Sequence, residues 1–193
     1  MSPDTRHSLI YALAGQAGWF ICVLSAAHYA GWLGTLCVAV LAAVHLRCIP
    51  HPRREACLCL CVALLGWLWD SVPAHYGWLR YSSGVVLPGF APYWMASLWV
   101  LFALQINILY RRLRAHYWLA SAIGCAAGPL SFRAGAALGA VEFTRPLVAW
   151  IALGAAWAVL LPAIVWLGAR FDGTTLAARP PTGNLSPRKA SGG

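Results

Sequence analysis

Six long runs of apolar residues follow one another along the chain, separated by short segments that hold most of its charged residues and prolines. The runs cover residues 9–27, 31–46, 56–72, 92–110, 115–132 and 146–168. Most of them contain about 16–19 residues, close to the shortest helix that crosses a hydrocarbon core ~30 Å thick. The pattern predicts an all-α fold, a polytopic transmembrane bundle of about six helices.

The composition excludes a soluble protein of this length. Apolar residues make up 61% of the 193 residues and charged residues only 10%, against about 25% charged residues in ordinary soluble domains. The net charge of +9 comes from short basic clusters between the apolar runs, and no soluble module is present to carry a basic patch. We therefore expect the lipid bilayer as the environment of the chain, and no binding of nucleic acid.

Basic residues divide unequally between the two sides of a six-span topology. The side shared by both termini and by the second and fourth connections receives eleven Arg and Lys residues, and the other side receives Arg80, Arg133 and Arg145. Because cytoplasmic loops carry the excess of positive charge, both termini are predicted to be cytoplasmic.

The two ends of the chain lead to two further expectations. The run at 9–27 could instead be a signal peptide cleaved after Ser25-Ala26-Ala27, but it is longer than a usual signal core and contains two glycines and a glutamine. We therefore expect a retained span and a membrane domain over residues 1–170. Residues 171–193 are rich in Pro, Gly, Ser and Thr without apolar periodicity, which predicts a disordered cytoplasmic tail.

Histidine and cysteine gather around the second connection, where His45, Cys48 and His51 precede Cys57. Thiolates and imidazoles are ligands for zinc or copper. On a helix, however, the alternating cysteines that begin at Cys57 point to different faces, and cysteine also serves as a small apolar residue. We predict no metal and no cofactor, and these four residues are the candidate ligands if a metal is bound.

Small residues recur in the fifth run, where Gly124, Gly128, Gly135 and Gly139 are spaced for close approach to another helix. The Gly128-Pro129 pair predicts a break near the outer end of this helix. Such a break is tolerated only where its backbone groups meet protein or water. We interpret it as the kinked end of a tight helix contact, with a ligand-lining break as the alternative.

Few polar residues lie within the runs. The amides Gln16, Gln105 and Asn107 are neutral, and such side chains commonly join transmembrane helices by hydrogen bonds. They favour a structural role.

Ionisable residues on the predicted outer side form the candidate catalytic set, which consists of Asp70, His75, Arg133 and Glu142. An acid, a base and a cation on one side are the components of an active site. A buried carboxylate also needs a partner, and a guanidinium is the natural one. We therefore predict that Asp70 and Arg133 pair beneath the loop that contains His75 and beside Trp94.

Three motifs, taken in order, resemble a family of small bacterial membrane proteins, domain of unknown function 2878. They are Trp-Leu-Trp-Asp at 67–70, Pro-Tyr-Trp at 92–94 ahead of Leu-Trp-Val-Leu-Phe at 98–102, and Gly-Pro-Leu-Ser-Phe-Arg-Ala-Gly at 128–135 ahead of Leu-Gly-Ala at 138–140. The resemblance extends over residues 9–168. It implies a single domain in the inner membrane of a Gram-negative type of bacterium. Asp70, Trp94, Pro129 and Arg133 match motif positions, and no catalytic role can be carried over to them.

Three functions fit these features. The favoured one is a structural or accessory protein linked to membrane lipid metabolism, which would have a membrane-protein partner. The alternatives are an integral membrane enzyme that acts on a lipid at an outer-face site, and a small transporter. Against the transporter, charges within the runs are scarce and repeated halves are not evident. Whether the protein is an enzyme stays open.

Overall fold

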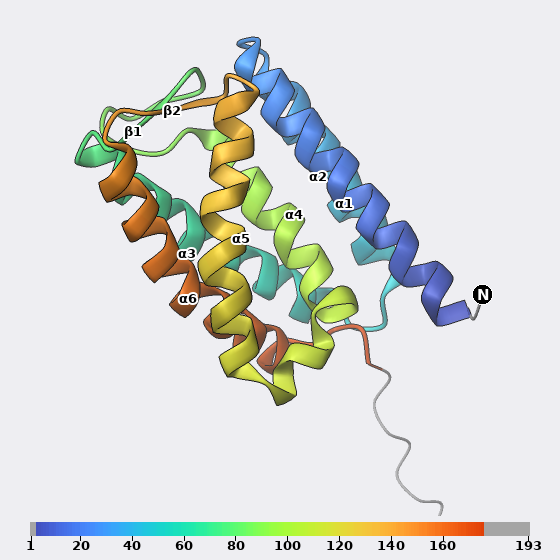
Figure 1. The fold of residues 1–193 in the computed structure, drawn as a ribbon. Helices are drawn as coiled ribbons and strands as arrows, with labels where there is room; N and C mark the ends of the chain where they lie inside the picture. Colours follow the sequence, from blue (N-terminus) through green and yellow to red (C-terminus); the bar gives the residue numbers. More distant parts are fainter. Residues whose placement is uncertain (1–2, 176–193) are drawn as a thin grey trace, which may run out of the picture.

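The computed structural model describes residues 3–175 as a bundle of six α-helices (Figure 1). In chain order the elements are α1 Pro3–Ala27, α2 Gly31–Cys48, α3 Pro52–His75, β1 Leu79–Tyr81, α4 Tyr93–Leu109, the short 3₁₀ helix η1 Arg111–Ala115, α5 Tyr117–Ala137, β2 Val141–Phe143 and α6 Pro146–Arg170. The all-α prediction is confirmed, and each predicted run corresponds to one α-helix. The run at 92–110 exceeds α4 by one residue at each end, and the run at 115–132 begins in η1 and stops before α5 ends at Ala137.

Four of the described helices are long and apolar enough to cross a membrane, namely α1 from Thr5 onward, α2, α3 and α6. Helix α4 is apolar but has only 17 residues. Many large apolar side chains, such as Leu13, Trp32 and Val159, are exposed on the outer surface of the bundle. A surface of this kind is suited to lipid, where it costs nothing to leave apolar groups outside the core.

The helices alternate in direction, so the bundle has two distinct ends. The end with strands β1 and β2 is called the sheet end, and the end with the N-terminus and residues 171–175 is called the terminal end (Figure 1). Arg80 and Arg133 lie at the sheet end, whereas Arg111 and Arg114 lie at the terminal end. These four arginines lie at the ends that the sequence predicted for them, whereas Arg179, Arg188 and Lys189 of the predicted split lie outside the described residues.

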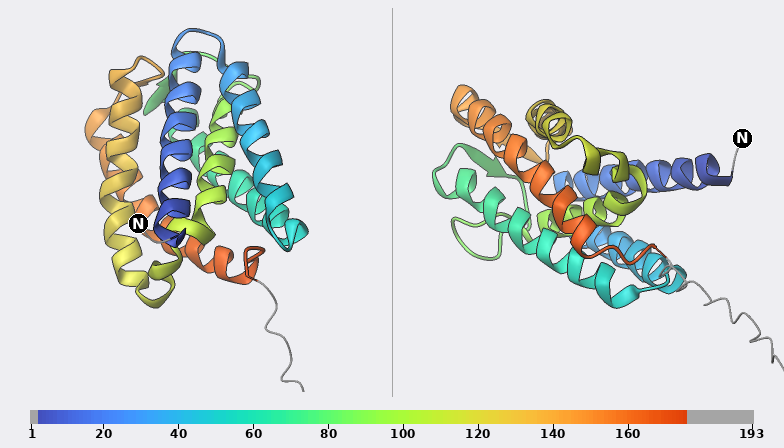
Figure 2. Two further views of the ribbon diagram at one scale, coloured as in Figure 1. Left: turned by 90° about the vertical axis from the view of Figure 1, so that its right-hand side faces the viewer. Right: turned by 90° about the horizontal axis from the view of Figure 1, so that it is seen from below.

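Helix α4 is the central element, and it packs against α1, α2, α3 and α6. Helices α1 and α2 form one closely packed pair, and α5 and α6 form another (Figure 2). By contrast, α1 and α5 stand side by side in both figures without packing extensively on each other. Few contacts therefore join α1 directly to α5.

The predicted break at Gly128-Pro129 is wrong, because α5 continues through it to Ala137. Proline inside a helix removes one backbone hydrogen bond, which neighbouring helices can tolerate in a membrane protein. Here α6 supports α5 along its length. The expected close contact is confirmed at Gly124 and Gly128, since a Cβ at either position would overlap Trp157 of α6.

A small antiparallel sheet, which the sequence did not predict, joins the two loops at the sheet end. Arg80 of β1 pairs with Glu142 of β2, and their side chains form an exposed ion pair at 3.7 Å. The hydroxyl groups of Ser82 and Ser83 donate hydrogen bonds to the carbonyl of Ala26, which ties the sheet to the end of α1. The loops that carry the predicted outer residues are thus held in place.

Candidate functional site

Asp70 of α3 is completely buried at the level of the sheet end. Its Oδ2 atom accepts a hydrogen bond of 2.7 Å from the indole Nε1 of Trp99 on α4. Its Oδ1 atom has no hydrogen-bond partner among the residues that the structure describes. A buried carboxyl group with one unsatisfied oxygen is costly, so this oxygen marks a position where a ligand or water can bind.

The position of Trp99 depends on a stack that joins four helices. Its ring lies against Gly66 of α3, where a Cβ would overlap the indole. On its other side it stacks on Trp157 of α6, with ring centroids 4.8 Å apart and an angle of 17° between the planes. Trp157 in turn covers Gly128 of α5. Two indoles between two glycines therefore fix the donor that faces Asp70.

An apolar cavity of about 120 Å³ lies beside this stack. Asp70 and Trp99 line it together with residues of α1, α5 and α6. Trp19 and Ser131 belong both to this cavity and to a groove of about 600 Å³ that runs between α1 and α5. The cavity and the groove together are called the lateral cleft.

A more polar hollow of about 600 Å³, called the mouth, adjoins the lateral cleft at the sheet end. Arg80, Arg133 and Glu142 line it, and Val141 belongs to both this hollow and the cavity. The Glu142 carboxylate is paired with Arg80. Arg133 is exposed and has no ion-pair partner among the side chains that the structure describes, which leaves the mouth with an uncompensated positive charge.

The structure brings the predicted catalytic set together only in part. Arg133 and Glu142 share the mouth, and Asp70 lies in the adjoining cavity with Trp94. The predicted pair of Asp70 and Arg133 is wrong, because Asp70 is buried against Trp99 whereas Arg133 is exposed. His75 is exposed at the end of α3 and contacts Tyr76, away from both hollows.

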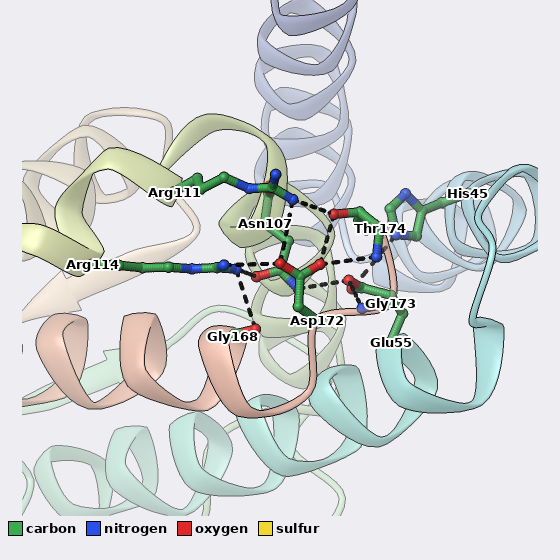
Figure 3. Close-up of polar contacts among 9 residues, drawn as sticks. All are labelled: His45, Glu55, Asn107, Arg111, Arg114, Gly168, Asp172, Gly173 and Thr174. Atoms are coloured by element: carbon green, nitrogen blue, oxygen red, sulfur yellow. Dashed lines mark hydrogen bonds and ion pairs between the residues drawn. The ribbon is translucent and has the colours of Figure 1, made fainter. Parts of the chain in front are cut away.

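A second group of polar residues is buried at the terminal end (Figure 3). Glu55 of α3 is fully buried, and its Oε1 accepts hydrogen bonds from Asn107 Nδ2 at 2.6 Å and from the backbone N–H of Gly173 at 3.1 Å. Asn107 uses its own oxygen to accept a bond of 2.6 Å from Arg114. The amide on α4 therefore joins α3 to η1, which confirms the structural role expected of Asn107.

The same network holds the segment that follows α6. Asp172 Oδ2 lies 2.8 Å from Arg114 Nη1 and 3.3 Å from Arg111 Nη2, and its Oδ1 accepts bonds from Thr174 (Figure 3). Burial acts to raise the pKa of Asp172, but the hydrogen bonds from Thr174 and Arg114 and the charge of Arg114 lower it below its ordinary value. The folded domain therefore extends at least to Thr174. Residues 176–193, the rest of the predicted tail, lie outside the described residues.

The four candidate metal ligands do not meet at one point. His45 is buried between Tyr11 and Glu55, whereas Cys48 and Cys57 are exposed. His51 is the residue before α3, and its backbone bonds to Gly173. Within the part of the chain that the structure describes, no three His, Cys, Asp or Glu side chains are placed to hold a metal ion.

Sequence reasoning missed Glu55, Arg114 and Asp172. The sequence did contain a signal for these residues. The chain has only five acidic residues, and a carboxylate near a membrane span needs a polar partner. Helix alternation also places the start of α3 and the end of α6 at one end of the bundle. The partners themselves depend on how the helices are arranged around α4, which periodicity does not give.

The described part of the chain is an all-α bundle with four helices long and apolar enough to cross a membrane and many apolar side chains on its outer surface, which are the features of a polytopic helical membrane protein. A family model described as a protein of unknown function, DUF2878, matches residues 8–163. The chain belongs to this family, and the resemblance drawn from its motifs is confirmed. No curated protein and no solved structure matches the chain.

Proposed function

We propose that the protein is an accessory protein of membrane lipid metabolism that binds an amphipathic lipid in the lateral cleft. The observation that carries this proposal is a buried, half-satisfied carboxyl group, Asp70, in an apolar cavity that adjoins a groove between two lipid-exposed helices. An apolar chain fits the lining, and a hydroxyl or amide group of the lipid would donate to the free Oδ1.

The mouth at the sheet end determines the type of head group. Arg133 is exposed and unpaired among the described residues, and Arg80 lies in the same hollow. A phosphate or carboxylate would form charge-assisted bonds with these guanidinium groups. We therefore assign an anionic head group to the mouth and the apolar chain to the groove between α1 and α5.

The proposed location is the inner membrane of a bacterium, with both termini in the cytoplasm. The excess of basic residues at the terminal end supports this orientation. In it the cleft opens into the outer leaflet, and the accessory role implies a membrane-enzyme partner that receives the lipid.

The enzyme alternative has one observation in its favour. A carboxyl group with a free oxygen beside bound lipid has the position of a general acid or base. The two roles differ in what happens when Asp70 is replaced by Asn. An accessory protein would bind less lipid and leave the lipid chemistry reduced but present, whereas an enzyme would lose the reaction completely.

The test compares lipids that copurify with three forms of the protein in mild detergent, measured by native mass spectrometry. Gly135→Leu places a side chain toward the cavity that Gly135 lines, and Ala126→Leu is the matched control on an exposed position of α5. We expect an anionic lipid to be enriched on the wild type and on Ala126→Leu, and to be lost from Gly135→Leu. Lipids in bulk-membrane proportions on all three forms would overturn the proposal.

A further inference from the structure

Three ionisable side chains follow one another across the terminal half of the bundle. The polar network described above, which joins Glu55 to Asn107 and Gly173, accounts for only one of them, Glu55. The hydroxyl of Tyr11 on α1 lies 2.7 Å from Nδ1 of His45 on α2. The Nε2 atom of His45 lies 3.7 Å from Oε2 of Glu55 on α3. His45 is only 4% exposed and Glu55 is fully buried.

The geometry gives each group a distinct role. The Oε1 atom of Glu55 is fixed by Asn107 and Gly173, whereas its Oε2 has no hydrogen-bond partner among the described residues and faces His45. In the tautomer whose Nδ1 accepts the Tyr11 proton, the ring proton is on Nε2, which faces this carboxylate at 3.7 Å without forming a hydrogen bond to it. A hydroxyl, an imidazole base and a carboxylate that orients the base have the order that activates nucleophiles in hydrolytic enzymes.

Tyr11 lies between two neighbouring hollows and lines both of them. One is an apolar groove of about 160 Å³, with Leu41, Val44 and Leu104 among its walls. The other is a polar vestibule of about 450 Å³ that includes His7 and Arg111. Tyr11 belongs to both hollows. An amphipathic molecule with its chain in the groove would therefore present its head group to the phenol.

The charge of the vestibule indicates the class of head group. The Arg111 side chain is 46% exposed, so its guanidinium can reach a ligand while it remains near Asp172. The ring of His7 lies 4.8 Å from that of Tyr11 on the same helix. A guanidinium that lies in the same vestibule as the Tyr11 hydroxyl suits a phosphate ester.

We propose that the terminal end contains a second site, separate from the lateral cleft, in which Tyr11 is a nucleophile toward a phosphate ester of a lipid-like alcohol. The phenol O–H bond breaks, its proton moves to His45 Nδ1, and the phenolate oxygen bonds to phosphorus. The ester oxygen leaves with its electron pair and takes the proton from His45. Glu55 stabilises the imidazolium between these steps, and Arg111 holds the phosphate oxygens.

The test measures the reactivity of individual tyrosines in the intact, detergent-solubilised protein. An aryl sulfonyl fluoride bonds to a phenolate oxygen with loss of fluoride, and peptide mass spectrometry gives the rate at each tyrosine. Tyr29, which is 79% exposed, is the internal reference. We expect Tyr11 to react about 10²-fold faster than Tyr29, the usual contribution of a positioned base, and His45→Gln to remove this advantage.

Dodecyl phosphate is the probe for the substrate class, and neutral dodecyl maltoside is its control. We expect dodecyl phosphate to slow labelling of Tyr11 without changing that of Tyr29, and the maltoside to have no such effect. Equal rates at Tyr11 and Tyr29 in the wild type would overturn the proposal without any variant. An unchanged Tyr11 rate in folded His45→Gln, or equal protection by both amphiphiles, would also overturn it.

Discussion

Asp70 of α3 and Trp99 of α4 are joined by a hydrogen bond of 2.7 Å from the indole to the carboxyl group. The indole can donate there because its ring lies against Gly66 on one side and Trp157 on the other. The carboxyl group is thus held by one side-chain donor, and its second oxygen is buried without a hydrogen-bond partner among the described residues, in a side chain that lines the lateral cleft. One oxygen of Asp70 therefore has a structural role, and the other is the one proposed to bind a ligand.

Replacing Asp70 separates these two roles. In Asp70→Asn the amide oxygen still accepts the Trp99 bond, so we expect a loss of only about 1 kcal/mol in the free energy of unfolding. Asp70→Ala leaves the indole N–H without an acceptor and creates a void, so we expect a loss of about 2–4 kcal/mol. Denaturant melts in detergent measure both. Equal losses in the two variants would contradict the assigned bond.

The glycines of the indole stack give a second prediction. Gly→Ala in a helix ordinarily stabilises by up to about 1 kcal/mol, but at Gly66 and Gly128 the added methyl would overlap an indole. We expect each substitution to destabilise by about 1–3 kcal/mol. Gly154 on α6 is the matched control, since its Cβ would have no neighbour closer than 3.4 Å. If Gly66→Ala left the free energy of unfolding unchanged, the close contact between Gly66 and the indole of Trp99 would be contradicted.

The mouth of the cleft gives a prediction about charge. Arg133→Gln should lower the amount of anionic lipid that copurifies, without changing the melting temperature, because Arg133 is exposed and has no ion pair within the described part of the chain. Arg112→Gln, an exposed arginine at the terminal end, is the control. If both variants retained lipid as the wild type does, the head group would lie elsewhere.

Asp172 predicts a pH dependence of stability. Its pKa in the folded protein lies below the ordinary value of 3.8. A carboxyl group of this kind stabilises the fold above its unfolded-state pKa, and loses that contribution as the pH falls through the folded-state pKa. We therefore expect Asp172→Asn to lower the melting temperature at neutral pH, and the gap from the wild type to shrink as the pH falls below about 3.8. A gap that stays constant in acid would contradict this.

The orientation can be tested with reporter fusions. A fluorescent protein fused after Thr174 should fluoresce, and alkaline phosphatase at the same point should be inactive, because the terminal end is predicted to face the cytoplasm. Phosphatase inserted after Val86, in the loop between β1 and α4, should be active. The opposite pattern would invert the proposed leaflets of both sites.

The sequence predicted the helices well because each apolar run is long, and most runs begin or end beside charged residues or proline. Its predicted break at Gly128-Pro129 failed for a physical reason, since support from α6 outweighs the local cost of proline. The rule that proline breaks a helix considers one helix alone, whereas the continuation of α5 through Pro129 depends on its packing against α6.

The candidate site was predictable only in outline. Asp70 and Arg133 do lie at one end of the bundle, as charge counting indicated. Their pairing was not predictable, because the helix facing Asp70 is α4 and the donor there is an indole rather than a guanidinium. Charge complementarity favoured Arg133, but only the packing arrangement shows which side chain is within reach.

The segment that closes the terminal end has a consequence for how the protein is made. Gly173 and Asp172 supply partners to Glu55 and Arg114, which leave the ribosome far earlier in synthesis. Until Asp172 and Gly173 emerge, the buried carboxylate of Glu55 and the guanidinium of Arg114 lack their complete set of partners. Translation that stops short of Asp172 would leave an otherwise complete helical bundle open at one end.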